Sequence, residues 1–359
     1  MLSVDAALPQ MLARNGIDAD VTYFSMIGGE TLEAPEQSTF STRTYRELNV
    51  RVSYHEYDVV LIWGDFLHSR HFHTDVTLSV KQKYPGRQTD EIENTIYKCL
   101  MMEGQPSTVL DRTICFGGSL YINGPCDDWD HRYRSAVERL YSQARLVLTR
   151  DPVSAAFARM YGARGATLGV DASFLLEPSG RLQANASQIG YSFGRGIANS
   201  HLARIRTDRL VSAIRKDGNF SKIVNLRWLE KTDMPPMVNL QQKLEQITNC
   251  ALVVTDTYHC AINAWREGVP AFCVGLGTEY AENTLSEKKK ELLYSMFNAR
   301  DFYVYAERIS LVSPHKMARK LLSVYRDQNI SKLISRNILM ATQMAERALI
   351  QAIMSPGHS

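Results

Sequence analysis

The chain has 359 residues, of which 45% are hydrophobic and 22% are charged, a composition typical of a folded globular protein. Its 41 lysines and arginines and 38 aspartates and glutamates leave a net charge of +3, too small to indicate binding to nucleic acid. No apolar run approaches the roughly 18 residues of a membrane helix, and no basic segment followed by an apolar core opens the chain. We expect a cytoplasmic protein of two domains, with peripheral association with the inner face of a membrane left open.

Apolar runs rich in Val, Ile and Leu alternate with helical patterns, which indicates parallel sheets with crossover helices and an α/β fold. In the first half the predicted helices are His131–Gln143 and Val153–Met160. The predicted strands are Asp20–Phe24, Asp58–Trp63, Thr113–Phe116, Arg145–Thr149 and Ala166–Leu168. We expect one doubly wound, Rossmann-like domain over residues 1–184.

The second half repeats this pattern after the stretch Glu177–Ser187, which has linker composition. The predicted strands are Gln188–Phe193, Lys222–Leu226, Leu252–Thr255 and Ala271–Val274, and the helices lie near Leu202–Lys216, Leu240–Thr248 and Ala261–Glu267. Two further helices are predicted at Lys316–Arg326 and Ile330–Met354. We expect a second Rossmann-like domain over residues 185–328, and a C-terminal helix over 329–359 that packs across the domains.

The N-terminus departs from the usual order of a doubly wound domain. Such a domain normally begins with a strand that becomes central in its sheet, whereas this chain opens with a helical pattern over Leu2–Leu12. We therefore expect the natural protein to begin roughly ten to thirty residues upstream, with an apolar strand and a glycine turn next to Asp5.

The residues that follow the predicted strands are candidates for a site, because ligands of open parallel sheets bind beyond the carboxyl ends of the strands. The strongest segment runs from Ala251 to Gly277, where a buried strand leads into Asp256, Thr257, Tyr258 and His259 and then a helix. A helix N-terminus offers backbone N–H groups and partial positive charge to an anion. The alternative, in which Asp256 or Thr257 only caps the helix and His259 packs in the core, fits the sequence equally well.

Cationic side chains follow other strands. Arg150 is expected at the rim of the first domain, before Asp151, which fits a helix N-cap. Arg227 follows the strand Lys222–Leu226. The triplet Lys288, Lys289 and Lys290 could bind phosphate, although lysines on a helix are more often a solvated face.

Glycine turns end two strands of the first half, at Gly64 and at Gly117, Gly118 and Ser119, and they would allow a ligand to approach the backbone closely. Asp65 and His68 follow the first of these turns and are candidate acid or base groups. The spacing of His68, His71 and His73 matches no familiar metal site, and the six cysteines form no Cys-x-x-Cys pair, so we predict no metal centre.

Taken together, these segments resemble the polysaccharide pyruvyltransferases, a family built on a two-domain fold like that of the GT-B glycosyltransferases. The resemblance covers about Tyr57 to Gly277. It rests on the strand ending at Gly64, on Gly118-Ser119 with Gly124-Pro125, on Arg150-Asp151-x-x-Ser154, on Val170–Leu176, and on His259 followed by Gly268-x-Pro270. It implies two domains that face a cleft, the first on the acceptor side and the second on the donor side, with C-terminal helices that cross back.

The resemblance implies a transferase that moves pyruvate from phosphoenolpyruvate onto two hydroxyls of a sugar as a cyclic ketal, in a cell-surface or exopolysaccharide or its lipid-linked precursor. No cofactor is implied. His259 would be the catalytic residue, with Asp65 and His68 addressing the acceptor. The donor would be held by Arg150, Arg227, Thr257, Tyr258, Lys288, Lys289 and Lys290. Family members commonly carry Arg-Leu-His at 257–259, so Thr257 replaces an arginine that would grip the donor phosphate.

Two other functions remain open at this point. A GT-B glycosyltransferase would hold the diphosphate of a nucleotide sugar at the same helix N-terminus, and it would be protected from unfolding by UDP- or GDP-sugars instead of phosphoenolpyruvate. A non-catalytic member of a polysaccharide assembly complex would fit the missing arginine. It would bind no donor and would tolerate the loss of His259.

Overall fold

The structure is a computed structural model that describes residues 2–34, 40–64, 67–120, 131–165, 167–180, 186–198, 200–230, 232–277, 285–311 and 313–355. The chain forms two compact units. The C-terminal unit comprises Met1–Gln10, Ala34–Phe40 and Leu176–Met340, and the N-terminal unit comprises Met11–Glu33, Ser41–Leu175 and Ala341–Ser359. Each unit is described by itself below.

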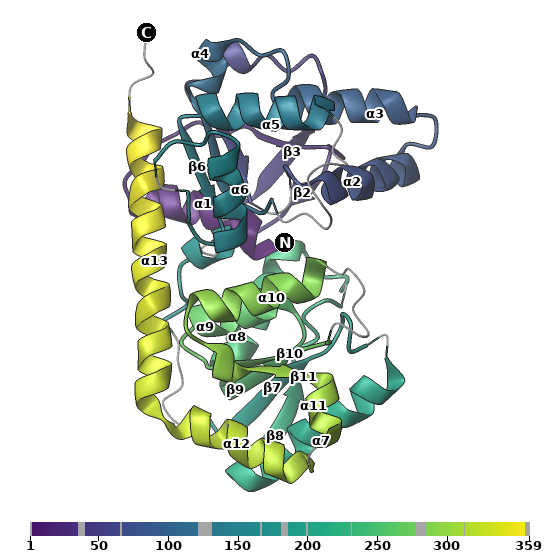
Figure 1. Cartoon of the computed structure of the whole chain (residues 1–359), viewed down its shortest axis with the longest axis vertical. Helices are drawn as coiled ribbons and strands as arrows, with labels where there is room; N and C mark the ends of the chain where they lie inside the picture. The colour runs from purple at the N-terminus through teal and green to yellow at the C-terminus, as the bar shows by residue number, and fades with distance from the viewer. Residues whose placement is uncertain are drawn as a thin grey trace. The chain divides into compact units, whose positions relative to one another are not determined.

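The C-terminal unit is built on a five-stranded parallel sheet in the order β11-β10-β9-β7-β8 (Figure 1). Its strands are β7 (Gln188–Ser192), β8 (Lys222–Asn225), β9 (Cys250–Thr255), β10 (Ala271–Gly275) and β11 (Tyr303–Tyr305). β9 lies in the middle and β10 is buried along its whole length. Helices cover a parallel sheet on both faces, which explains why the sequences of these two strands are almost continuously apolar.

Helices fill the connections between these strands: α7 (His201–Gly218), α8 (Pro236–Thr248), α9 (Tyr258–Arg266) and α10 (Leu285–Met296), with a 3-10 turn η5 (Arg300–Phe302) before β11. Two further helices, α11 (Ala306–Leu311) and α12 (Pro314–Arg326), follow the last strand. α12 packs along α7, burying Met317, Ala318, Leu321 and Leu322 (Figure 1). α13 (Gln328–Met354) follows, and its residues up to Met340 belong to the C-terminal unit and those from Ala341 to the N-terminal unit.

The N-terminal unit contains a parallel sheet of β4 (Val60–Trp63), β5 (Thr113–Gly118) and β6 (Leu146–Thr149), with β5 in the middle. A second, small sheet pairs β3 (Arg43–Glu47) in parallel with β1 (Tyr23–Ser25) and antiparallel with β2 (Thr31–Leu32). The α/β class with parallel sheets is therefore confirmed for both units.

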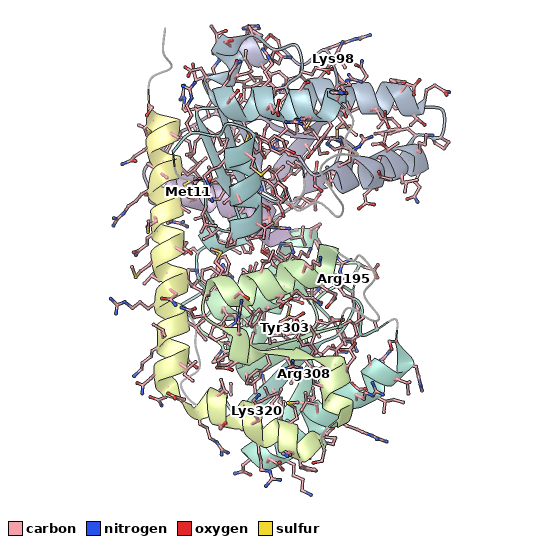
Figure 2. All side chains as sticks on the ribbon, viewed as in Figure 1. Met11, Lys98, Arg195, Tyr303, Arg308 and Lys320 are labelled. Atoms are coloured by element: carbon pink, nitrogen blue, oxygen red, sulfur yellow. The ribbon has the colours of Figure 1, made fainter. Side chains whose placement is uncertain are left out.

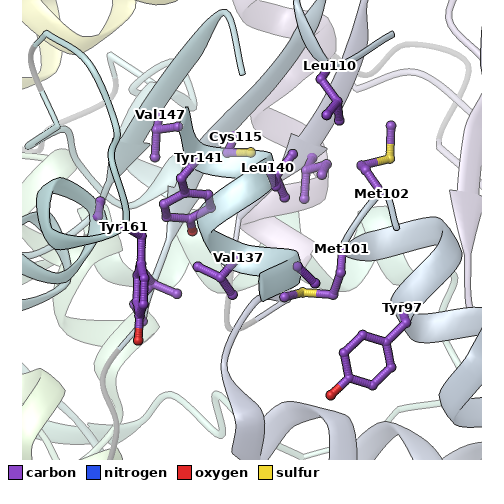
Figure 3. Packing of buried hydrophobic residues seen from close by; sticks show 14 of the residues in the cluster. Tyr97, Met101, Met102, Leu110, Cys115, Val137, Leu140, Tyr141, Val147 and Tyr161 are labelled. Atoms are coloured by element: carbon purple, nitrogen blue, oxygen red, sulfur yellow. The ribbon is translucent and has the colours of Figure 1, made fainter. Parts of the chain in front are cut away.

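The helices of the N-terminal half are α1 (Leu2–Arg14), α2 (Arg70–Lys83), α3 (Thr89–Thr95), α4 (Ser107–Leu110), α5 (His131–Gln143) and α6 (Pro152–Met160), with short turns η1 (Tyr54–Glu56), η2 (Ile96–Leu100) and η4 (Ala172–Leu175). α5 places Val137, Leu140 and Tyr141 against Cys115 of β5 and Val147 of β6 (Figure 3). This cluster is the hydrophobic core beneath the three-stranded sheet.

Most of the predicted long elements are present, and apart from the 14-residue helix α2 the differences concern short elements. The strand expected at Asp20–Phe24 is instead β1 at Tyr23–Ser25, and the strand expected at Ala166–Leu168 is reduced to a single bridge between Leu168 and Thr149. The helices α2, α3, α4 and α11 and the strands β2, β3 and β11 were not predicted. These strands have only two to five residues, too few for an alternating pattern to show.

Candidate functional site

The middle strand of the C-terminal sheet ends in buried polar residues. β9 ends at Thr255, and the next residues, Asp256 and Thr257, are 0% and 3% exposed. The Thr255 hydroxyl donates to the carbonyl of Ser192, the last residue of β7, at 2.8 Å. The ends of β7 and β9 are thereby held together at the carboxyl edge of the sheet, where ligands of parallel sheets bind.

The Asp256 carboxylate holds the loop that follows β7. Its Oδ1 accepts from the backbone N–H of Gly194 at 3.0 Å, and its Oδ2 accepts from those of Arg195 at 3.0 Å and Ile197 at 3.1 Å. A buried carboxylate is stable only when such donors satisfy it, so the carboxylate and the loop depend on each other. Asp256 is therefore a positioning residue that fixes residues 194–197 beside the start of α9.

α9 presents a histidine in its first turn. The helix begins at Tyr258, and its N-cap residue Thr257 makes no side-chain capping hydrogen bond. His259 is partly exposed, and its ring lies edge-on to that of Tyr258 with 5.2 Å between centroids. Because the positive end of the helix dipole lies here, this turn favours an anionic ligand beside the imidazole of His259.

The other end of α9 is tied down by a buried ion pair. Arg266 contacts Glu267 at 2.5 Å, and the exposed fractions of the two side chains are 3% and 1%. Arg266 also donates to the carbonyl of Glu177, while Glu267 accepts from the backbone and the hydroxyl of Ser179. Burial lowers the pKa of Arg266 to about 10, so the guanidinium remains charged at neutral pH. α9 is therefore anchored at its carboxyl end independently of the site.

The three lysines of the predicted triplet have different environments. Lys288 is exposed, and Lys289 lies over the ring of Tyr258 with its Nζ 5.1 Å from the centroid. Lys290 is buried, and its Nζ donates to Glu287 at 2.6 Å and to the carbonyl of Asp256 at 3.1 Å. The prediction that Lys290 binds the donor is therefore wrong, because its ammonium is used to hold α10 against the end of β9.

Two arginines follow strands at the same edge of this sheet. Arg227 comes after β8, in the left-handed region with φ of 48°, and its exposed guanidinium lies 3.7 Å from Glu230. Arg195 follows β7, the strand next to β9, and its side chain is exposed (Figure 2). Arg195 is thus closer in strand order to His259 than Arg227 is, and its backbone is bonded to Asp256.

The glycine turns of the N-terminal unit serve the chain itself. Gly117 has φ of +71°, and a Cβ atom there would lie 3.1 Å from the backbone nitrogen of Ala172. Gly64 donates its N–H to the carbonyl of Phe116 at 2.7 Å, and Gly118 pairs with Thr149. The expectation that Gly117 opens space for a ligand is therefore wrong, because the chain's own backbone occupies that space.

Ser119 and Asp151 belong to a buried hydrogen-bonded group. Asp151 caps α6, accepting from the backbone N–H and the hydroxyl of Ser154 at 2.8 and 2.7 Å, which confirms the N-cap prediction. The Ser119 hydroxyl donates to Asp151 at 3.1 Å. These side chains join the end of β5 to the start of α6, and Ser119 is only 2% exposed.

Arg150 is buried, not placed at a rim. Its guanidinium lies 3.1 Å from Asp171, and both side chains are 1% exposed. Asp171 in turn accepts from the backbone of Ser173 at 3.0 Å. The prediction that Arg150 grips the donor phosphate is therefore wrong, since a buried guanidinium must keep its carboxylate partner.

His68 is also a core residue. Its Nε2 lies 3.1 Å from the carbonyl of Leu100, and its Nδ1 lies 3.0 Å from the hydroxyl of Tyr141. A carbonyl can only accept, so Nε2 carries the proton and Nδ1 accepts from Tyr141. Burial lowers the pKa of His68 to about 4. The imidazole is neutral and enclosed, so the proposed acid or base role of His68 is wrong.

Asp65, the other predicted acid or base on the acceptor side, lies outside the described residues, as does the side chain of His71. Within the described part of the chain, no three His, Cys, Asp or Glu side chains gather as metal ligands would. In the same residues, no helix combines the length and the apolar character of a membrane span.

Sequence reasoning missed the two residues that shape the edge of the C-terminal sheet, Asp256 as an anchor and Arg195 as a cation. A signal for Arg195 was present: Gly194-Arg195-Gly196 comes directly after a correctly predicted strand, where ligand-binding residues are expected. The partners of Asp256 could not be read from the sequence, because they are backbone groups about 60 residues away along the chain.

Parallel α/β units, one of them with a histidine at a helix N-terminus on the sheet's carboxyl edge, are typical of enzymes that bind anionic ligands. The chain belongs to the polysaccharide pyruvyl transferase family, whose family model matches residues 6–277. It is accordingly a transferase.

Two solved structures overlap with most of the chain at low similarity. A crystal structure described as the glycotransferase of kitacinnamycin is 11% identical, covers 80% of this chain and 83% of its own, and has a TM-score of 0.35. CalG4, the calicheamicin glycosyltransferase, is 12% identical, with coverages of 78% and 81% and a TM-score of 0.36. These TM-scores are too low to support an argument, and no curated protein matches the sequence.

Proposed function

We propose that this chain transfers pyruvate from phosphoenolpyruvate onto two hydroxyls of one sugar, forming a cyclic ketal on a cell-surface or exopolysaccharide or on its lipid-linked precursor. Membership of the polysaccharide pyruvyl transferase family supports the reaction class. The observation that carries the choice of site is the turn between β9 and α9, where His259 stands at a helix N-terminus beside a loop fixed by buried Asp256.

Phosphoenolpyruvate carries a phosphate and a carboxylate, so its site needs several positive groups. The first turn of α9, which begins at Tyr258, supplies the positive end of the helix dipole, next to the position where the resemblance places an arginine that this chain lacks. The backbone N–H of Thr257 is not part of this supply, because it donates to the Thr255 hydroxyl at 3.0 Å. We propose that Arg195 provides the missing charge from the adjacent loop, with Arg227, Lys288 and Lys289 as further cations. Guanidinium groups suit this role because they bind phosphate and carboxylate through two parallel hydrogen bonds.

The chemistry requires one proton to be delivered and two to be removed. A proton added to the methylene carbon of the enol makes C2 electrophilic, and a sugar hydroxyl forms a bond to C2 as it loses its proton. The bond from C2 to the phosphate oxygen then breaks and releases inorganic phosphate. The second hydroxyl closes the ring and loses its proton, so phosphoenolpyruvate and a diol become a ketal and phosphate.

We assign His259 to proton transfer at this site or to the leaving phosphate, since it is the histidine of the turn; the residue is partly exposed, although its Nε2 atom is buried. An imidazole can give and take protons near neutral pH. His68 has no part in this scheme, because it is buried. Asp65 remains our candidate on the acceptor side.

The test is mass spectrometry of the surface glycan from cells with and without this protein. We expect the mass of a pyruvate ketal only when the protein is present, and an unchanged glycan would overturn the proposal. In vitro, phosphoenolpyruvate should protect the purified chain from thermal unfolding, whereas UDP- and GDP-sugars should not. Protection by a nucleotide sugar alone would favour a glycosyltransferase.

A further inference from the structure

Positive charge is concentrated in one short part of the C-terminal unit. Residues 314–340, which form α12 and the first half of α13, contain six lysines and arginines and one acidic residue, for a net charge of +5. The whole chain carries +3, so all the other residues together sum to −2. The positive charge is therefore distributed unevenly along the chain, and the net charge of the whole chain does not reveal this.

All six of these cationic residues are exposed: Lys316, Arg319, Lys320, Arg326, Lys332 and Arg336. In the described part of the chain, none of them forms an ion pair with a carboxylate, in contrast to the buried Lys290 and Arg266. Figure 2 labels Lys320 on α12. A groove between α7 and α12 is lined by Arg209 and Lys216, which add two cations, and also by Asp208 and by His315, whose ring lies 2.9 Å from Asp217.

Apolar side chains lie among these cations on α13. Leu333, Leu339 and Met340 are 50%, 56% and 50% exposed, while Ile334 and Ile338 on the other side of the helix are 0% and 7% exposed. At 100° per residue, positions 332, 333, 336, 339 and 340 fall within a third of the helix circumference. One face of α13 therefore presents two cations and three large apolar side chains together.

We infer that this basic surface, the six cations with Leu333, Leu339 and Met340, binds an anionic lipid bilayer. Clusters of four to eight lysines and arginines are attracted by anionic headgroups, at about 1 kcal/mol or fivefold in affinity for each residue near the surface. Exposed leucine and methionine among them can enter the boundary between headgroups and acyl chains, as in interfacial amphipathic helices. The apolar residues favour a membrane over a polyanion such as nucleic acid or an acidic glycan, which would leave them in water.

The charge of the rest of the chain orients this contact. Because the remaining residues sum to −2, the net positive charge of the chain comes from residues 314–340, and an anionic bilayer attracts this part more strongly than the rest. The chain is thereby held on the membrane by α12 and α13. Only the consequence that it meets a lipid-linked acceptor there rests on the proposed function; the binding itself does not.

The test is cosedimentation of the full chain with two kinds of vesicle. One kind contains phosphatidylcholine alone, and the other contains about one-third phosphatidylglycerol, which gives the vesicle a negative surface potential. We expect binding to the mixed vesicles only, and binding that weakens as salt shortens the Debye length. The triple variant Lys316→Gln, Arg319→Gln and Lys320→Gln should bind about a hundredfold more weakly. Replacing Leu333, Leu339 and Met340 by serine should remove the binding that persists in high salt.

The matched control replaces Arg51, Lys98 and Lys222 by glutamine, which removes the same charge from exposed positions elsewhere. Its binding should stay within a few-fold of the unmodified chain, and thermal unfolding should show that all variants fold. Absence of binding to the mixed vesicles, an equal loss in the control, binding to a soluble anionic polysaccharide but not to vesicles, or self-association through the apolar residues would each overturn the inference.

Discussion

The two parallel sheets use polar residues at their carboxyl ends in opposite ways. In the N-terminal unit, Arg150 and Asp171 pair with each other in the interior, and His68 is enclosed by Tyr141 and Leu100. In the C-terminal unit, the buried Asp256 binds backbone N–H groups, and His259 and Arg195 keep part of their surface exposed.

This difference distinguishes two roles of a polar residue that follows a strand, a structural role and a ligand-binding role. Where the buried polar side chains bind one another, they stabilise the fold at this edge of the sheet. Each is held in place because leaving its partner unpaired would cost free energy. Where a buried carboxylate holds backbone groups, the loop is fixed while its side chains stay available to a ligand. The candidate site therefore lies in the C-terminal unit, and the experiments below test that division.

The largest effect is expected from breaking the ion pair of the N-terminal unit. Arg150→Met leaves the Asp171 carboxylate buried without its cation, and removing one partner of such a pair costs about 3–5 kcal/mol. Urea unfolding should show this loss, and the double variant Arg150→Met with Asp171→Leu should recover part of it. A fully stable single variant with weakened binding of phosphoenolpyruvate would instead restore Arg150 to the donor site.

The next effect concerns the anchor in the C-terminal unit. Asp256→Asn turns one accepting oxygen into an NH₂ group that faces backbone donors, and each unsatisfied buried group costs about 1–3 kcal/mol. We expect a comparable loss of stability in urea together with a loss of turnover, because the loop 194–197 is released. Conversely, a variant with normal stability and normal turnover would show that the loop does not need this carboxylate.

A smaller effect should appear as pH dependence in the N-terminal unit. Burial lowers the pKa values of His68 and His73 from 6.5 to about 4, with the charges of His68 and Arg70 adding to the shift of His73. Between these values the unfolded chain binds protons that the folded chain does not, so stability is full above about pH 6.5 and falls as the pH drops towards 4. Each histidine should contribute a loss of about 2 kcal/mol between pH 7 and 5.

His73→Phe is the variant that isolates this titration. The His73 ring packs edge-on between Tyr97 and Tyr133, so an apolar ring fits the same contacts. The free energy of unfolding of the variant should be measured by denaturation at pH 5 and pH 7. The difference between the two values should be smaller than in the unmodified chain by the contribution of one histidine, about 2 kcal/mol. An unchanged dependence would mean that His73 does not titrate in this range.

The smallest effect is expected at the exposed cation of the site. Arg195→Gln removes one charged hydrogen-bond donor, and at an exposed position this should raise the KM for phosphoenolpyruvate by about tenfold. The variant should keep its stability, because the backbone N–H of residue 195 still binds Asp256. Lys98→Gln, in the N-terminal unit, is the matched control. Equal KM values in the two variants would remove Arg195 from the donor site.

Most long elements could be predicted because they repeat a pattern over many residues, although the 14-residue helix α2 was missed. α5 was found at its observed limits, and the strands β9 and β10 were found because both faces of a central parallel strand are buried. β2 and β3 have too few residues for periodicity and are fixed by pairing partners that the sequence does not name.

The site could be predicted in position but not in composition. The rule that ligands meet the carboxyl ends of strands led to His259, yet it applied equally to Arg150 and His68. What separates them is burial: the Arg150 side chain is enclosed with that of Asp171, a residue 21 positions away. Whether a polar side chain faces a partner of its own chain is decided by tertiary packing, which no local pattern contains.

The central claim is that the turn between β9 and α9 performs the transfer. Its most direct test is the release of phosphate from phosphoenolpyruvate in the presence of an acceptor saccharide, measured for the unmodified chain and for His259→Ala. Loss of a proton-transfer residue should lower kcat by about 10²–10⁴ while the thermal unfolding of the chain stays unchanged. A folded His259→Ala variant that turns over at the normal rate would contradict the claim.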